Sequence, residues 1–506
     1  MGQATPCAKR ACGRAGTRKP PPDSLSRRMR DLLRDLMDSA ARRADYADAR
    51  FVRTRAERLS TRNGALDQLD WHESEGIGVR VRVGGAWGFA AARGTGKADA
   101  EAALERALAV AAAQPASNGP ALAPEPPAEG SWANEVERDP FAISLEDKLG
   151  VLSAADAGLR TEPGVTLTMA RFQALQVEKL FASTEGALCE QRIGECGGGI
   201  AAVAVNGVES QVRSHPASHG GHVAQAGYEH FLTLDLAGHA PRVSEEAVAL
   251  LRAPACPPGR TTVILAGEQL GLQIHESIGH AVELDRVLGR EASYAGTSFV
   301  PVNGVGSLRL GSEHVNVTAD AGNPGGLGSF RWDDEGVEGR VVPLVSEGVL
   351  SGFLSSRETA AETGLGRSGG CMRADGFTRQ PIVRMTNVNL EPGSAGTLDD
   401  LIADTGEGLL IDTNRSWSID NRRLHFQFEA EAAWEIRGGR RGRLLRNPSY
   451  AGLTPEFWAS CDAVCSAPDW TMISLLDCGK GEPGQVARVS HGSAPARFRN
   501  VQVGVA

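Results

Sequence analysis

Residues 426–436 decide the fold class, because apolar side chains occupy almost every second position of Phe426-Gln-Phe-Glu-Ala-Glu-Ala-Ala-Trp-Glu-Ile436. The positions between them carry Gln427, Glu429, Glu431 and Glu435. Successive side chains of a β-strand point to opposite faces of the sheet. The alternation therefore predicts one long strand with a buried face and a polar face.

Elsewhere the chain combines strand and helix patterns. Val79, Val81 and Val83 alternate with arginines, and the Gly84-Gly85 pair behind them is typical of a two-residue hairpin turn. A helix is expected from Gly267 to about residue 285, and the residues after it are dominated by strand patterns. We therefore expect an α+β protein, with an N-terminal mixed α/β domain followed by a β-rich C-terminal domain.

Proline-rich stretches indicate where domains meet. Five prolines fall within residues 115–127, and Pro254-Ala-Cys-Pro-Pro-Gly259 marks a second boundary. The predicted organisation is a disordered basic tail at 1–24, an N-terminal domain at 25–252 with possible sub-units 25–114 and 141–252 joined by a linker at 115–140, and a C-terminal domain at 260–506.

A short internal similarity links the two halves of the N-terminal domain. Glu57-Arg-Leu-Ser-Thr, followed by Gly64-Ala-Leu, resembles Glu178-Lys-Leu-Phe-Ala-Ser-Thr-Glu-Gly-Ala-Leu188 with small insertions. Two related strand–helix units would explain the similarity, and so would chance.

Composition excludes several classes of function. The 506 residues carry 53 basic and 62 acidic side chains, a net charge of −9, and an acidic body repels the phosphates that drive nucleic-acid binding. We find no apolar run long enough to cross a membrane and no apolar core of a signal peptide. Nine irregularly spaced cysteines do not form a disulfide framework. These features predict a cytoplasmic protein with no nucleic-acid or membrane partner.

The motif that carries chemistry is His275-Glu276-Ser-Ile-Gly-His280. Zinc peptidases of the HExxH type place two histidines one turn apart on a helix, with the glutamate as general base. Here the histidines are five positions apart, roughly 140° around a regular α-helix, and would point away from each other. One wider turn, as in a π-bulge, returns them to one face. We therefore predict a widened or broken helix over Ser277–His280, helped by the flexibility of Gly279.

Two imidazoles leave a catalytic zinc ion one protein ligand short, because such ions usually take three and keep one position for water. The candidates for the third ligand are His314, His425, His491 and Cys478. Cys478 lies in the glycine-flanked stretch Leu475-Leu-Asp-Cys-Gly-Lys-Gly481, where a thiolate can turn inward, but an ordinary free thiol fits the same stretch.

Several blocks of the chain resemble the TldD branch of the TldD/PmbA metallopeptidases over about residues 40–506. They are His275-Glu-Ser-Ile-Gly-His-Ala-Val-Glu-Leu-Asp285, Tyr294-Ala-Gly-Thr-Ser-Phe299, Asp333-Asp-Glu-Gly336, Gly348-Val-Leu-Ser-Gly-Phe353, Arg384-Met-Thr-Asn387, Thr413-Asn-Arg-Ser-Trp-Ser-Ile-Asp420 and Cys478-Gly479.

The resemblance implies that Cys478 is the third ligand of one Zn²⁺ ion per chain. It also implies a C-terminal domain built on a strongly bent, barrel-like antiparallel sheet that carries one metal-binding helix. TldD-type chains pair with a PmbA (TldE) type chain that lacks the metal motif, so the expected partner is such a subunit or a second copy. Because this chain keeps both histidines and Glu276, it resembles the catalytic member.

The expected activity is hydrolysis of unfolded or short peptides by a metal-activated water, with Glu276 as general base. Glu283 or Asp285 can accept the outer N–H of a metal-bound imidazole, unless both are solvated carboxylates at a helix end. An extended peptide could bind a β-rich site by adding a strand.

Two alternatives remain open at this stage. The chain could be a scaffolding subunit with a structural zinc ion, or a zinc amidohydrolase of a small-molecule or peptide natural-product pathway. The sequence also leaves open the role of Arg384, and whether Asp333, Asp334 and Glu335 meet a substrate amine or form an exposed turn.

Overall fold

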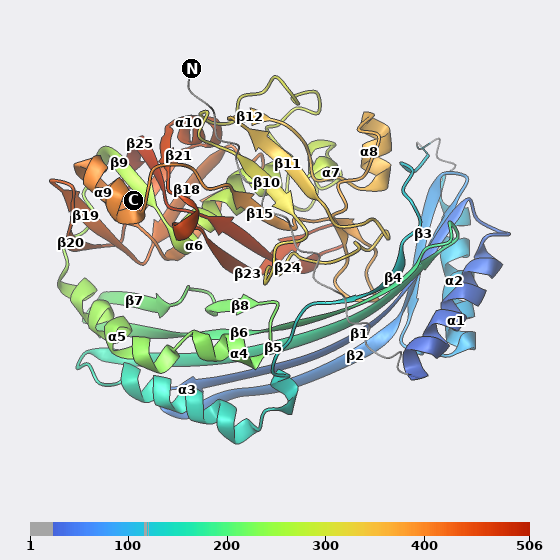
Figure 1. The fold of residues 1–506 in the computed structure, drawn as a ribbon, viewed down its shortest axis with the longest axis horizontal. Coiled ribbons are helices and arrows are strands. Elements are labelled where there is room, and N and C mark those ends of the chain that lie inside the picture. The colour runs from blue at the N-terminus through green and yellow to red at the C-terminus, as the bar shows by residue number, and fades with distance from the viewer. Residues whose placement is uncertain (1–23, 116–118, 120, 506) are drawn as a thin grey trace, which may run out of the picture.

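The computed structural model describes residues 24–115, 119 and 121–505. It consists of a long curved sheet that cradles a compact C-terminal half on its concave side (Figure 1). The basic tail expected at residues 1–24 lies, except for Ser24, outside these ranges. Within them, no helix is long and apolar enough to cross a membrane.

The curved sheet has eight strands in the order β3-β2-β1-β5-β6-β4, with β7 and β8 also paired to β6. Its strands are β1 (Tyr46–Arg62), β2 (Ala65–Val83), β3 (Ala86–Ala92), β4 (Glu129–Ala133), β5 (Val165–Ser183), β6 (Leu188–Asn206), β7 (Glu209–His215) and β8 (His222–Ala224). The Gly84-Gly85 turn joins β2 to β3 as expected, and both glycines have positive φ.

The two similar segments lie in β-hairpins rather than in the expected strand–helix units. The first repeat covers the turn between β1 and β2, and the second covers the turn between β5 and β6. The two hairpins meet where β1 pairs antiparallel with β5, from Asp48 opposite Ser183 to Arg62 opposite Met169. The pairing joins the two hairpins into one continuous sheet.

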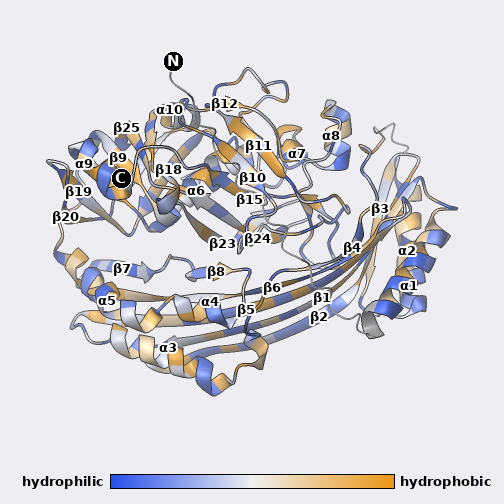
Figure 2. Ribbon diagram, in the orientation of Figure 1, coloured by the Kyte–Doolittle hydropathy of each residue, from blue (hydrophilic) through white to orange (hydrophobic). Residues whose placement is uncertain are grey.

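Helices cover the convex face of this sheet at both ends (Figure 1). They are α1 (Ser24–Ala40) and α2 (Lys97–Ala113) at one end, and α3 (Leu145–Leu159), α4 (Tyr228–Thr233) and α5 (Leu236–Arg252) at the other. Each end has its own apolar core, one around Leu33, Val79 and Leu104 and the other around Leu152 and Phe172. Both colours of Figure 2 run along these helices, as amphipathic segments require.

The C-terminal half contains two larger sheets. The six-stranded sheet has the order β12-β11-β10-β15-β24-β23. It is built from β10 (Val317–Asp320), β11 (Val341–Ser346), β12 (Val349–Leu350), β15 (Asn387–Leu390), β23 (Thr471–Lys480) and β24 (Gln485–Ser493). A separate short pair is formed by β13 (Met372–Arg373) and β14 (Ile382–Val383).

The second sheet has nine strands in the order β17-β18-β21-β25-β9-β16-β19-β20, with β22 paired to β25. Its strands are β9 (Gly259–Leu265), β16 (Glu407–Ile411), β17 (Asn414–Ile419), β18 (His425–Ala430), β19 (Ala432–Arg437), β20 (Arg440–Arg446), β21 (Ser449–Leu453), β22 (Cys461–Val464) and β25 (Ala496–Val503). The helices of this half are α6 (Gly267–Ile274), α7 (Leu284–Val287), α8 (Arg357–Thr363), α9 (Leu398–Thr405) and α10 (Thr454–Ala459).

The expected α+β class is confirmed. The two C-terminal sheets are open, however, because among the described residues their outer strands pair on one side only; these are β12 and β23 in one sheet and β17 and β20 in the other. Each also contains one parallel pair, β15 with β24 and β9 with β16. The barrel-like sheet expected from the family resemblance is thus neither closed nor wholly antiparallel.

The single strand predicted over residues 426–436 is wrong. The segment forms two strands, β18 and β19, which pair with different neighbours in the same sheet. Glu431 lies between the two strands and is buried. Its carboxylate accepts the Ser214 N–H at 2.9 Å and lies 3.1 Å from the Arg213 guanidinium. The chain turns there to bring Glu431 to the N-terminal sheet.

Part of the stretch predicted as a linker at 115–140 forms regular structure. After the five prolines within 115–127, residues 129–133 form β4 and pair in parallel with β6. Earlier in the stretch, Ala123 N–H donates to the Arg357 carbonyl at 3.0 Å, and Glu125 pairs with Arg340 at 3.1 Å. The segment therefore binds the C-terminal half.

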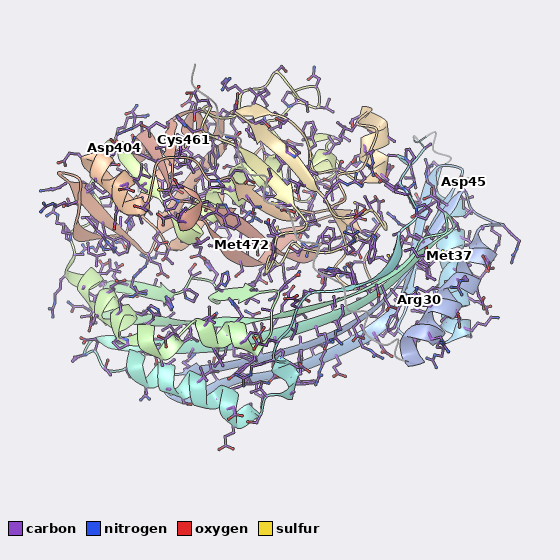
Figure 3. The ribbon with its side chains drawn as sticks, in the orientation of Figure 1. Arg30, Met37, Asp45, Asp404, Cys461 and Met472 are labelled. Carbon is purple, nitrogen blue, oxygen red and sulfur yellow. The ribbon has the colours of Figure 1, made fainter. Side chains whose placement is uncertain are left out.

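The halves also meet along β23. Figure 3 places Met472 on the side of the C-terminal half that faces the curved sheet. Its carbonyl accepts the His222 Nε2–H at 2.9 Å, and Val223 N–H donates to Ser474 Oγ at 3.0 Å. β8 thus covers the first part of the outer edge of β23.

Candidate metal centre

The helix that carries the two histidines widens where their spacing requires it. α6 continues into a π-helical turn at His275–Gly279, closed by the His280 N–H donating to the His275 carbonyl, and then into a 3₁₀ turn at His280–Val282. The wide turn brings the two imidazoles onto one face, with ring centroids 4.6 Å apart. The predicted distortion is present and begins two residues earlier than expected.

Gly279 is needed for a different reason from the one expected. Its φ of −52° is helical, so the backbone does not require glycine. A Cβ at this position would collide with the sulfur of Met385. The glycine therefore allows close packing of the widened turn against Met385, which lies in the connection between β14 and β15.

A β-bulge directs Cys478 toward the histidines. The pairing of β23 with β24 shifts by one residue between Leu475 and Cys478. Ile473, on the face that packs against α6, would without the shift share that face with Asp477 rather than Cys478. The extra residue reverses the alternation, and bulges commonly redirect a side chain in this way. The Sγ atom of Cys478 consequently lies 3.6 Å from Nε2 of His280.

The three side chains form one buried cluster. A ligand atom of each of His275, His280 and Cys478 lies within 4.8 Å of the others. Their exposed fractions are 3%, 3% and 6%. Two nitrogens and one sulfur around a common point fit the donor set of a catalytic zinc site.

Hydrogen bonds at the far side of each imidazole set its tautomer. His491 Nδ1 lies 2.8 Å from the Val388 carbonyl and must donate to it, so a neutral His491 accepts at Nε2. His275 Nδ1, 2.8 Å from that nitrogen, is then the donor. His280 Nδ1 likewise donates to Glu283 Oε2 at 2.8 Å. Both site histidines therefore keep the Nε2 lone pair for a metal ion.

The protonation states of the cluster suit a cation. Burial lowers the pKa of His275 to about 4 and that of His280 well below its usual range, so both rings are neutral near pH 7. Burial alone would raise the pKa of the Cys478 thiol, but the positive charge of the Arg384 guanidinium opposes it and the pKa is lowered. Arg384 reaches this position by donating to the Cys478 and Gln485 carbonyls.

A buried set of charges supports the His280 side of the cluster. The Lys480 ammonium, itself fully buried, lies 3.3 Å from Glu283, 2.8 Å from Asp285 and 3.5 Å from Glu291. Of the two carboxylates proposed from sequence to contact an imidazole, Glu283 does so, whereas Asp285 pairs with Lys480. Lys480 therefore links the strand of Cys478 to the partner of His280.

Glu276 lies beside the ligands and pairs with an arginine that the sequence analysis did not single out. Its Oε2 is 2.6 Å from Nη1 of Arg423, and the two side chains are 9% and 13% exposed. Arg423 comes from the loop between β17 and β18. No spacing or composition signal in the sequence connects it to residue 276, which is 147 positions away.

The other candidate histidines are not part of the three-residue ligand cluster. His491 lies in β24, where it contacts His275. His314 lies in an exposed turn and His425 begins β18, also exposed.

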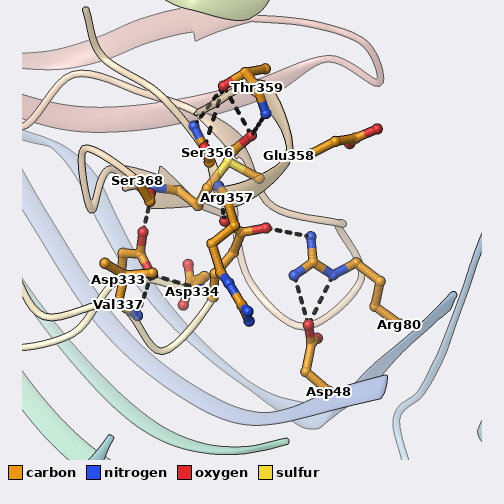
Figure 4. A network of polar contacts seen from close by, with 12 residues as sticks. Asp48, Arg80, Asp333, Asp334, Val337, Ser356, Arg357, Glu358, Thr359 and Ser368 are labelled. Carbon is orange, nitrogen blue, oxygen red and sulfur yellow. Dashed lines mark hydrogen bonds and ion pairs between the residues drawn. The ribbon is translucent and has the colours of Figure 1, made fainter. Parts of the chain in front are cut away.

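The acidic run at residues 333–335 is buried and does not form the exposed turn that the sequence allowed. Figure 4 shows Asp333 and Asp334 among a network of polar contacts that also includes Asp48 and Arg80. Asp334 lies 3.0 Å from the Lys179 ammonium, and Glu335 lies 3.2 Å from Arg80. These buried ion pairs fasten the C-terminal half to the curved sheet.

Three profiles of one protein family match the chain in order. They describe the PmbA/TldA metallopeptidase domain 1 over residues 47–111, the central domain over 138–252 and the C-terminal domain over 258–505. Together they cover most of the chain, including the whole of the metal-ligand cluster.

Known proteins agree with this match. A protein named metalloprotease from Methanothermobacter thermautotrophicus is 30% identical over 481 residues, which are 94% of this chain and 98% of the relative. A zinc metalloprotease TldD homolog from Saccharolobus solfataricus is 28% identical over 247 residues, 49% of this chain and 52% of that protein. The crystal structure of TldE from Thermococcus kodakarensis has the same fold, with a TM-score of 0.73 and 15% identity over 94% of this chain and 100% of that one.

These likenesses define the class of the protein, which is a metallopeptidase. Within that class, the chain belongs to the PmbA/TldD family.

Proposed function

We propose that this chain is a zinc-dependent peptidase in which His275, His280 and Cys478 hold one Zn²⁺ ion and Glu276 is the general base. The observation that supports the proposal is the convergence of two neutral imidazoles and an acidified thiol within 4.8 Å, with Glu276 adjacent in sequence to the first ligand. A zinc metalloprotease among the relatives agrees with this choice of metal.

The residues of the proposed site have different roles in the reaction. Zinc, when bound, supplies a Lewis acid that polarises a carbonyl and lowers the pKa of a water molecule. Glu276 takes the proton of the attacking water on a carboxylate oxygen and passes it to the leaving amine nitrogen. Glu283 and His491 keep the ligand imidazoles in the tautomer that leaves Nε2 free.

The substrates we propose are unfolded or short peptides. The three ligands are at most 6% exposed, so a scissile bond must enter a narrow, buried site to reach them. An extended chain can do so, whereas a folded domain cannot. The fold shared with TldE supports a partner subunit of the PmbA/TldE type or a second copy of the chain, and we place the complex in the cytoplasm.

A peptide digest tests this function. The purified chain, alone and with a PmbA-type partner, is incubated with a mixed peptide pool, and products are identified by mass spectrometry with and without a chelator. We expect chelator-sensitive cleavage in at least one condition. No such products in either condition would contradict the peptidase proposal and favour the amidohydrolase of a small-molecule or peptide natural-product pathway.

The Glu276→Gln variant separates catalysis from a structural role of zinc. The proposal predicts loss of hydrolysis while bound zinc remains near one per chain. Glu313→Gln makes the same chemical change on an exposed turn and should leave both values unchanged. Wild-type cleavage in Glu276→Gln would exclude Glu276 as the general base.

A further inference from the structure

We infer that Arg423 is a positioning residue for Glu276: its guanidinium holds the carboxylate in the orientation that proton transfer requires. The inference rests on the proposed function, because it assigns Arg423 a role only if Glu276 is the base. It begins from the 2.6 Å contact between Arg423 Nη1 and Glu276 Oε2.

The backbone around Arg423 is fixed by several independent contacts. Its φ of 63° lies in the left-handed region, which a non-glycine residue adopts at a cost and keeps only where the surroundings impose it. Its N–H donates to the Asp420 carbonyl at 2.9 Å, and its carbonyl accepts the Thr454 hydroxyl at 2.8 Å. The direction of the side chain is therefore set by the fold.

The Asp420 side chain locks the rest of the loop. Its carboxylate accepts the backbone N–H groups of Arg422 at 2.9 Å, Leu424 at 3.0 Å and His425 at 3.1 Å. Arg422, next to Arg423 in the same loop, points to solvent. The loop thus presents one of two neighbouring arginines to the metal centre and the other to water.

Stability alone does not explain this arrangement. The Arg423 side chain is 13% exposed, and its Nε is buried with no hydrogen-bond partner among the residues that the structure describes. A buried cation with an unsatisfied donor is costly, and a strained backbone adds to the cost. Rules of stability are most often broken at functional sites, where a group is held for its chemistry.

The contact can restrain the Glu276 carboxylate while leaving its second oxygen without a contact to Arg423. It is a single N–O contact at Oε2 rather than a two-pronged pair. The contact ties Glu276, on the widened turn after α6, to the loop between β17 and β18 of the nine-stranded sheet. Because small displacements of a catalytic group can cost about 10²-fold in rate, this restraint should appear in kcat rather than in KM.

Steady-state kinetics on a cleaved peptide tests the inference. We expect Arg423→Met to lower kcat by about 10²-fold with little change in KM. Arg423→Lys should recover about tenfold of the loss, because a single contact needs one cationic donor. Arg422→Met removes the same charge from the adjacent exposed position and should leave kcat and KM unchanged.

A second measurement does not depend on activity. In metal-free protein, Arg423→Met should shift the thermal unfolding midpoint by a different amount in the wild-type background than in Glu276→Gln, because contacting residues are not additive. Equal shifts in both backgrounds would contradict the coupling. Zinc content should stay near one per chain in Arg423→Met.

The outcomes separate the two proposals. If the wild-type protein cleaves no peptide, the proposed function fails, whatever the unfolding data show. If it does cleave, but Arg423→Met has the kcat of Arg422→Met, the inference about Arg423 is overturned. A raised KM with unchanged kcat would also overturn it, since Arg423 would then contact substrate rather than act through Glu276.

Discussion

Cys478 and His280, separated by 198 residues in sequence, bring Sγ and Nε2 within 3.6 Å of each other. Two local irregularities create this proximity, a π-helical turn under His280 and a β-bulge before Cys478. Each irregularity places a side chain on a face that it would not occupy in a regular helix or strand. The candidate metal centre therefore depends on distortions of both elements that build it.

The carboxylate behind His280 should control metal affinity. Glu283→Gln keeps the size of the side chain but removes the negative charge of the carboxylate. This carboxylate accepts the His280 Nδ1–H and faces Lys480. We expect zinc affinity to fall by about 10–100-fold, as is usual when the hydrogen-bond partner of a ligand histidine is lost. Competition with a chromogenic chelator measures the change.

Glu313→Gln is the control for that experiment, because it changes an exposed glutamate in a turn. Equal zinc affinities in Glu283→Gln and Glu313→Gln would mean that Glu283 does not support the metal ligand.

The acidic run at 333–335 should contribute to stability rather than to catalysis. Asp334→Asn leaves the buried Arg50 and the Lys179 ammonium without their common carboxylate. Removing one partner of a buried ion pair typically costs about 3–5 kcal/mol. We expect a clear fall in the denaturant midpoint, with bound zinc near one per chain at low denaturant.

Asp31→Asn provides the comparison. Its pair with Arg34 lies on an exposed helix surface, with side chains 65% and 57% exposed, and such pairs contribute about 0–1 kcal/mol. Similar midpoints for the Asp334 and Asp31 variants would show that the interdomain ion pairs carry little stability.

How much of this could be predicted from sequence depends on the range of the interaction. The widened turn follows from the spacing of His275 and His280, because geometry leaves few other ways to join them. The bulge before Cys478 has no comparable local signal, because the strand that pairs with Leu475-Leu-Asp-Cys is determined by the topology of the whole sheet. Similarly, the alternation over 426–436 is real, but the contact of Glu431 with Ser214 breaks the strand.

Charged residues were the least predictable part of the structure. Arg423 and Lys480 look like ordinary surface cations in the sequence, and only the fold brings them to Glu276 and Glu283. The same holds for Asp334, whose partners Arg50 and Lys179 belong to strands of the N-terminal sheet. Local patterns identify the two candidate histidine ligands, and the family resemblance adds Cys478, but neither identifies the long-range charges that support them.

Glu268 should make stability depend on pH. Burial raises the pKa of this carboxyl to about 7, although hydrogen bonds from Ser218 partly oppose the shift. The folded state then holds its proton more tightly than the unfolded state, whose pKa lies near 4.5. The resulting stabilisation is complete below the unfolded value and is lost as the pH rises through about 7.

Glu268→Gln removes this titration and keeps an acceptor for the Ser218 N–H, which Glu268 binds at 2.9 Å. Thermal unfolding midpoints of the two proteins are compared between pH 4.5 and 8. We expect the wild-type midpoint to fall relative to the variant across this range. Unfolding midpoints of the two proteins that change in parallel with pH would show that the Glu268 carboxyl has the same pKa in the folded and unfolded states.

The most direct test of the account is zinc per chain, measured by mass spectrometry of the metal in purified wild type, Cys478→Ala and Cys256→Ala. Cys256 is also a buried free thiol but lies outside the cluster. We predict a value near one for wild type and Cys256→Ala and a marked fall for Cys478→Ala. Full zinc occupancy in Cys478→Ala would contradict the assignment of the metal centre.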